Sequence, residues 1–155
     1  TNTWNNTAAS SSVVTLGNNA NNNRVDSNDQ YIMYSFAEKQ GYSKIGSYTG
    51  NGNADGTFIY TGFKPAWVMV KQTNASGEDW FICDTKREGY NAENNRLMPN
   101  LSSAESTDSP IDILSNGFKA RQSGAAVNGS GASYIFMAFA ENPFVTSTGV
   151  PATAR

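Results

Sequence analysis

Short segments in which hydrophobic positions alternate with polar ones recur along this chain, and that period of two predicts β-strands. The clearest is "KPAWVMVKQT" from Lys64, which has Pro65 at its entry and β-branched and aromatic residues after it. Similar patterns predict further strands within residues 31–38, 41–50, 57–62, 80–85, 111–120 and 134–141. Asn, Ser, Thr and Gly are abundant and favour turns and strand connections over helix interiors, so the chain is expected to be all-β.

Turn residues separate these segments and indicate how the strands connect. "NASGED" lies between the strand from Lys64 and "WFICDT", which predicts an antiparallel hairpin, and Asn116 with Gly117 predicts a second one. Polar stretches at residues 18–29, 86–110 and 124–132 are typical of surface loops and crossings. The expected fold is an antiparallel β-sandwich of jelly-roll or lectin-like type.

One octet occurs twice. "YIMYSFAE" at residues 31–38 and "YIFMAFAE" at residues 134–141 share five of eight letters. Upstream, "SVVTLGNN" loosely matches "PIDILSNG", with Leu16 corresponding to Leu114. A repeat of about 100 residues is indicated, in which each octet is the closing strand.

The repeat predicts how the chain is organised. Residues 1–40 are the C-terminal part of a preceding copy, residues 41–144 form one complete sandwich module, and residues 145–155 form an extended tail. A module that begins midway, together with a first residue that is Thr1 and not Met, predicts a section of a longer protein.

Composition removes several function classes. A formal net charge of −2 with no Lys/Arg block argues against nucleic-acid binding. The longest apolar runs are of strand length, far below the roughly 20 residues that span a bilayer, so membrane insertion is not expected. With no histidine in the chain, Ser-His and Cys-His catalytic sites cannot be assembled. The single cysteine, Cys83, permits no internal disulfide and is interpreted as a core residue.

A family resemblance can now be stated. "AEKQGYSKIGSYTGNGNADGTFIYTGFKPAWVMVKQT", "NLSSAEST", "ILSNGFK" and "YIFMAFAENPF" are similar to a domain of uncharacterised function that recurs in tail-fibre and other virion proteins of marine bacteriophages. The likeness covers residues 31–155 closely and extends to the opening segment. It implies a virion structural protein with a lectin-like sandwich, and it carries over no ligand and no binding residue.

A glycan site would require exposed aromatic rings beside amide or carboxylate groups. Trp67 and Trp80 lie inside apolar strands, and we expect them in the core. Tyr90 lies in the polar loop "REGYNAENN", so the glycan-binding candidates are Tyr90, Asn91, Asn94 and Asn95. An ordinary loop tyrosine is the alternative interpretation.

Calcium is the one cofactor considered. "NGNADG" places oxygen ligands at Asn51, Asn53 and Asp55, as in the start of a calcium loop, but the terminal bidentate carboxylate is missing. A hairpin turn explains the same letters, and no other cofactor is expected.

The acidic residues give no catalytic pair. Glu38 and Glu141 occupy equivalent places in the two octets, and that equivalence favours a structural role over glycoside hydrolysis. The chain is therefore predicted not to be an enzyme.

Two functions remain. The first is a tail-fibre module that binds a bacterial surface glycan or receptor, and the second is a capsid-decoration or head-fibre protein with a structural role. Either places it on the virion surface, extracellular after release, with other virion proteins as partners. A chain without disulfides that begins midway through a module is expected to associate as a homo-oligomer, namely a trimer.

Overall fold

The computed structural model describes residues 3–24, 28–87, 91, 95–108 and 110–142, and the chain divides into two compact units, residues 1–36 and 37–155. In the described part of the second unit, the regular secondary structure consists of antiparallel strands arranged in two sheets. No helix in the described part of the chain has the length and apolarity required to cross a membrane.

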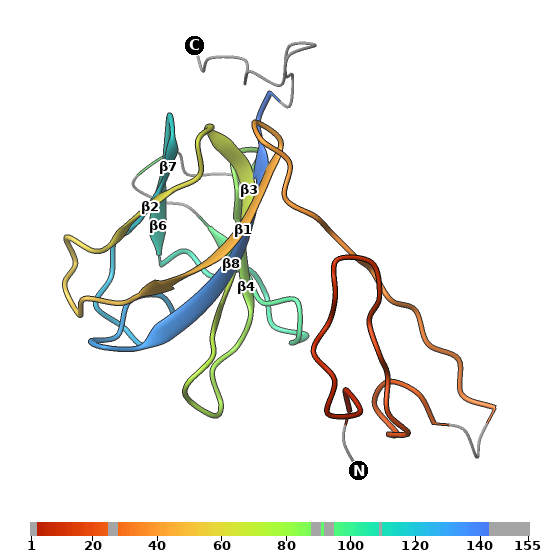
Figure 1. Ribbon diagram of the computed structural model, residues 1–155. Helices are drawn as coiled ribbons and strands as arrows, with labels where there is room; N and C mark the ends of the chain where they lie inside the picture. The colour runs from red at the N-terminus through yellow and green to blue at the C-terminus, as the bar shows by residue number, and fades with distance from the viewer. Residues whose placement is uncertain (1–2, 25–27, 88–90, 92–94, 109, 143–155) are drawn as a thin grey trace. The chain divides into compact units, whose positions relative to one another are not determined.

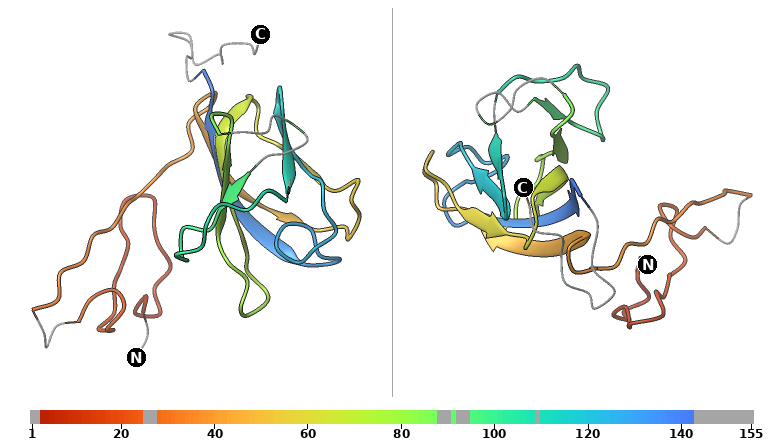
Figure 2. Two further views of the ribbon diagram at one scale, coloured as in Figure 1. Left: turned by 180° about the vertical axis from the view of Figure 1, so that it is seen from behind. Right: turned by 90° about the horizontal axis from the view of Figure 1, so that it is seen from above.

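The larger sheet has five strands in the order β1-β8-β3-β4-β5, and the smaller has three in the order β2-β7-β6. The two sheets face each other in Figure 1 and in the view from above in Figure 2, so the predicted antiparallel β-sandwich is confirmed. The strands are β1 (Ser43–Thr49), β2 (Phe58–Tyr60), β3 (Pro65–Gln72), β4 (Phe81–Asp84), β5 (Arg96–Leu97), β6 (Ile111–Leu114), β7 (Gly117–Ala120) and β8 (Ser133–Ala140).

The core lies between the sheets and follows the alternation along each strand. β8 contributes Tyr134, Phe136 and Ala138, all buried, and the partly buried Ala140, while its alternate side chains from Ser133 to Phe139 point to the opposite face. The Phe136 ring packs edge-on against Phe118 of the smaller sheet, with 5.4 Å between ring centroids. Further core residues come from both sheets: Ile59, Val68, Val70, Phe81, Cys83, Ile111, Ile113 and Ala120.

Both predicted hairpins are present. β3 pairs antiparallel with β4, and β6 pairs with β7 so that Leu114 lies opposite Gly117. Glycine is required at position 117, because a Cβ there would meet the backbone carbonyl oxygen of Ile59 on the neighbouring strand β2.

The prediction of a strand at residues 31–38 is wrong for this chain. Residues 31–36 belong to the first unit, and no strand is assigned to them or to the other described residues of that unit, which holds turns and the isolated bridge between Asn19 and Asn23. A strand needs a neighbour to satisfy its backbone groups, and β8 has two neighbouring strands, whereas no strand or bridge is assigned to residues 31–36.

Glu38 and Glu141 both make ion pairs, in keeping with their predicted structural role. The Glu38 carboxylate accepts hydrogen bonds from Lys44 Nζ and from the Ile45 backbone N–H at 3.1 Å each, and Glu141 pairs with Lys64 at 2.7 Å. The Lys44 bond and then the Ile45 bond hold the pKa of Glu38 below its ordinary value. The carboxylate thereby covers part of the open edge of β1.

Candidate binding site

The face of the five-stranded sheet that points away from the core carries an unbroken apolar row. The strand registers place Ile45 opposite Met137, Met137 opposite Met69, Met69 opposite Ile82 and Ile82 opposite Leu97. These five side chains are half-buried or exposed, and we call them, with Ile135, the outer apolar row. An outward sheet face is usually polar in a sandwich, so this row is a candidate contact surface.

Three aromatic rings lie at one end of this face. Trp67 is opposite Phe139 in the ladder, with 5.6 Å between ring centroids, and Tyr42 meets Phe139 edge-on at 5.8 Å. Tyr42 is 44% exposed. The group supplies rings of the kind that stack on sugars, and Trp67 and Phe139 lie on strands β3 and β8, while Tyr42 lies just before β1.

The tryptophan prediction is therefore corrected. Trp67 is half-buried on the outer side of β3, because Val68 and Val70 occupy the inward positions of that strand. Trp80 is also half-buried and lies just before β4, outside the strand. The sequence reasoning missed the outer face because it assigned apolar strand residues to one core. The signal was present, since "WVM" in β3 and "IFM" in β8 are apolar at consecutive positions.

Of the predicted glycan-binding residues, the two that the structure describes form hydrogen bonds within the fold. The Asn91 side chain forms two hydrogen bonds with the backbone of Ile113, donating at 2.7 Å and accepting at 2.8 Å. Asn95 is 8% exposed and donates to Glu105 at 2.8 Å. Tyr90 and Asn94 lie outside the described residues.

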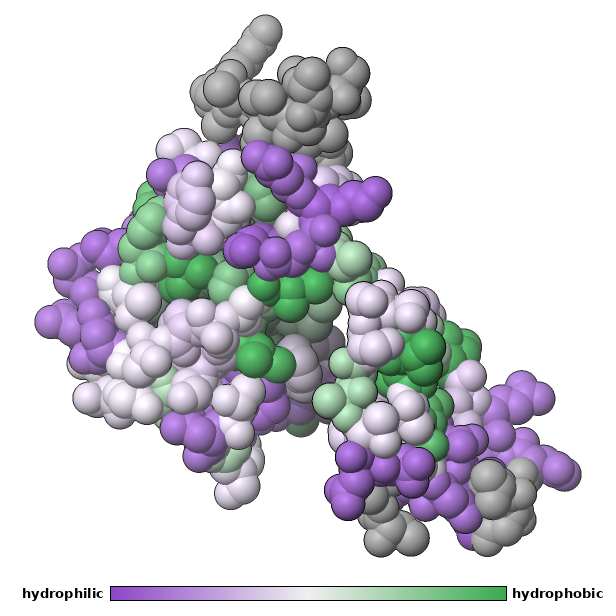
Figure 3. All heavy atoms as spheres, viewed as in Figure 1, coloured by the Kyte–Doolittle hydropathy of each residue, from purple (hydrophilic) through white to green (hydrophobic). Residues whose placement is uncertain are grey.

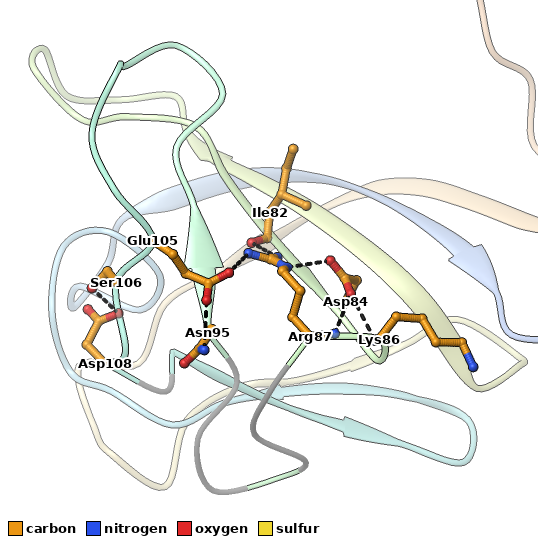
Figure 4. A network of polar contacts seen from close by, with 8 residues as sticks. All are labelled: Ile82, Asp84, Lys86, Arg87, Asn95, Glu105, Ser106 and Asp108. Atoms are coloured by element: carbon orange, nitrogen blue, oxygen red, sulfur yellow. Dashed lines mark hydrogen bonds and ion pairs between the residues drawn. The ribbon is translucent and has the colours of Figure 1, made fainter.

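Asn95 belongs to a network that ties the end of β4 to the loop after β5 (Figure 4). Arg87 is at its centre, donating to Asp84 at 2.7 Å, to Glu105 at 2.6 Å and to the Ile82 carbonyl oxygen at 3.0 Å. The backbone N–H of Lys86 donates to Asp84 at 2.9 Å. The arrangement satisfies all of these groups locally, as expected of a structural clamp.

Electrostatics in this clamp favour the charged forms. Burial alone would raise the pKa of Asp84, but the hydrogen bonds from Lys86 and Arg87 outweigh it and the pKa is lowered. Burial likewise opposes the charge on Arg87, yet its bonds to Asp84 and Glu105 raise its pKa.

The predicted calcium residues have their oxygen atoms directed at N–H groups. Asn51 Oδ1 accepts from the Asn53 backbone at 3.0 Å and from Asn128 Nδ2 at 2.7 Å, and Asn53 Oδ1 accepts from the Asp55 backbone at 2.9 Å. Asp55 pairs with Lys119, and the Lys119 bond is the main cause of its lowered pKa. These contacts form a turn, and no group of three or more acidic or cysteine side chains able to hold a metal occurs in the described residues.

Cys83 is confirmed as a core residue. Its side chain is fully buried, and burial raises the pKa of the thiol to about 12, so it is not a thiolate at neutral pH.

Comparison with known proteins gives one match. Residues 1–143 match the family described as Domain of unknown function (DUF7483). The chain belongs to this family. The match to DUF7483 spans both units of the chain. No curated protein and no solved structure matches it.

Proposed function

We propose that this DUF7483 protein is a non-enzymatic structural module of a bacteriophage virion, displayed on a tail fibre, where it binds a glycan or receptor on the host surface. The observation that supports this function best is the outward face of the five-stranded sheet, where Tyr42, Trp67 and Phe139 adjoin the outer apolar row. A sandwich displaying aromatic rings on a sheet face suits weak contacts that are multiplied over many copies.

A binding role is also favoured by the way reactive groups are used. Asp84 and Glu105 are bonded to Arg87, Glu141 is bonded to Lys64, and Asp55 is bonded to Lys119. Glycoside hydrolysis needs two carboxyl groups that are available to the substrate, and carboxylates committed to cations serve it poorly. The proposed activity is therefore recognition without chemistry.

Binding of the purified protein to an array of bacterial surface polysaccharides, with and without calcium, tests this function. Specific binding that is lost in Trp67→Ala and Tyr42→Ala but retained in Lys86→Ala supports recognition by the outer face. Loss in Tyr90→Ala alone assigns recognition to the 88–95 loop, and calcium dependence assigns a role to Asn51, Asn53 and Asp55. Absence of binding to any polysaccharide by the folded protein contradicts the receptor function.

A capsid-decoration or head-fibre protein is the second candidate, because an apolar outer face also suits attachment to other virion proteins. It places the protein on the virion surface, extracellular after release, with a structural role. Labelling purified particles with an antibody against this chain and imaging them distinguishes the two. Label along a fibre supports the receptor module, and label over the capsid supports decoration.

A further inference from the structure

Residues 31–36 carry a run of large apolar side chains that face solvent. Exposure reaches 81% for Ile32, 62% for Met33 and 78% for Tyr34, while Tyr31 and Phe36 are 40% and 54% exposed. Figure 3 shows hydrophobic residues at the surface of the unit to which they belong. Exposing so many large apolar side chains in one run is unfavourable in water, and exposed apolar surface of this kind marks an interaction site.

The same letters are buried where they occur for the second time. In β8 the inward residues Tyr134, Phe136 and Ala138 are between 0% and 5% exposed. β8 has neighbours on both edges, β1 and β3, so its backbone is paired on each side. By octet position the corresponding residues are Tyr31, Met33 and Ser35, which would form the inward side of an equivalent strand.

A second likeness is the hydrogen bond that the first tyrosine of each octet makes. The Tyr134 hydroxyl donates to the carbonyl oxygen of Ala125, nine residues earlier, at 2.5 Å. The Tyr31 hydroxyl donates to the carbonyl oxygen of Ala20, eleven residues earlier, at 2.8 Å. In both copies the hydroxyl of the first tyrosine therefore donates to a carbonyl oxygen in the polar loop that precedes it.

The slot that such a strand requires is taken in this chain. β8 fills the position between β1 and β3. The other edge of β1 is partly closed, because Ser43 is bridged to Lys39, the Ile45 N–H donates to Glu38, and Thr57 donates to the Thr49 carbonyl oxygen. Strand addition by a second identical chain at this edge would break those bonds.

We propose that residues 31–38 form the closing strand of another copy of this β unit. In that copy they lie between the strands equivalent to β1 and β3, which is the position of β8 in this chain. The partner is a sandwich that lacks its own closing strand. From the contacts of β8, it supplies a ring to stack on Tyr31, as Tyr48 stacks on Tyr134 at 4.8 Å. It also supplies a small aliphatic residue beside Met33, as Val70 lies opposite Phe136. This inference is independent of the proposed function, because it uses neither the ligand nor the location.

The first test replaces the octet of β8 by the sequence of residues 31–38 within the full chain. The substitutions Phe136→Met, Met137→Tyr and Ala138→Ser write the letters of residues 31–38 into β8. We expect one cooperative unfolding transition, with a midpoint within about 10–15 °C of the parent. The matched control, Phe136→Ser, Met137→Tyr and Ala138→Met, has the same composition but exchanges the two inward residues, and it should lose cooperative unfolding. An octet-exchanged chain that does not fold overturns the proposal.

The second test measures complementation. A chain of residues 39–132 lacks both octets, so β8 is missing and the chain has no octet of its own to replace it, whereas the full chain 1–155 offers residues 31–38. We expect the two to form a 1:1 complex in size-exclusion chromatography with light scattering, and Met33→Asp in the full chain to abolish it, whereas Asn28→Asp should not. A peptide of residues 133–141 shows that the slot is competent. If that peptide restores the shortened chain and the full chain does not bind it, the proposal is wrong. If the peptide fails as well, the octet exchange decides.

Discussion

The carboxamide of Asn128 is fully buried and holds the turn at residues 51–55 in place. Its oxygen accepts from the Asn51 backbone at 2.9 Å, and its nitrogen donates to Asn51 Oδ1 and to the Asn53 carbonyl oxygen at 2.7 Å each. These bonds explain why the asparagines of "NGNADG" serve the fold. At the scale of single residues, this amide network satisfies buried polar groups in addition to the ion pairs of the fold.

Asn128→Ala should lower the free energy of unfolding by about 2–4 kcal/mol, because three hydrogen bonds are lost and their buried partners are left unsatisfied. Urea denaturation measures the loss. Asn28→Ala, at an exposed asparagine, is the control and should stay within about 0.5 kcal/mol of the parent. Equal effects of the two substitutions would contradict the role given to Asn128.

Asp84 predicts a dependence of stability on pH. Its folded pKa lies below the unfolded value, so its contribution is complete above about pH 4 and is lost as the pH falls through the folded pKa. Asp84→Asn should destabilise the protein by about 1–3 kcal/mol at pH 7 and flatten the pH dependence below pH 4. Denaturation midpoints at pH 7 and pH 3 measure this. Ser76→Ala, at an exposed loop position outside the network, should keep the parent's slope. An unchanged slope in Asp84→Asn would refute the clamp.

At the scale of elements, the hairpin of β6 and β7 is sensitive at Gly117. Gly117→Ala should destabilise by about 2–4 kcal/mol, because the added Cβ meets the Ile59 carbonyl oxygen and pushes β2 away from β7. Gly124→Ala is the matched control, since nothing lies within 4 Å of a Cβ there, and it should be neutral or slightly stabilising. Thermal unfolding of both variants checks the prediction, and similar midpoints would contradict it.

The elements also show how far sequence reasoning reaches. Alternation located β3, β4 and β8, and the turn residues identified both hairpins. The octet at residues 31–38 has the same alternation as β8, yet no strand is assigned there, because pairing depends on neighbours that a local pattern does not supply.

At the scale of the whole molecule, we expect the purified chain to be a homotrimer, since the outer apolar row leaves hydrophobic area for partners to cover. Sedimentation equilibrium at micromolar concentration measures this. Ile135→Glu, at a row position that is 40% exposed, should weaken association, whereas Ser76→Glu in the β3–β4 loop should not. A stable, monodisperse monomer would contradict the trimer.

For the candidate sites too, the sequence predicted some features and the tertiary structure decided others. The sequence named Asn91 and Asn95 for a glycan because polar residues in a loop are available in principle. In the folded chain both side chains point inward, because Asn91 forms hydrogen bonds with the Ile113 backbone and Asn95 donates to the Glu105 carboxylate. Consecutive apolar letters in β3 and β8 indicate an apolar outer face, but only the strand register shows that residues from five strands lie in one line.

The sequence alone determined the all-β class, the principal hairpins, the core position of Cys83 and the absence of any histidine chemistry, because these follow from local periodicity, turn residues and composition. Tertiary structure decided which face of each strand is buried, which asparagines are consumed by internal bonds, and which of two nearly identical octets becomes a strand. The physical reason is common to all three. The residues that bury a side chain or pair with its backbone are distant in sequence, and the local sequence does not specify which residues these are.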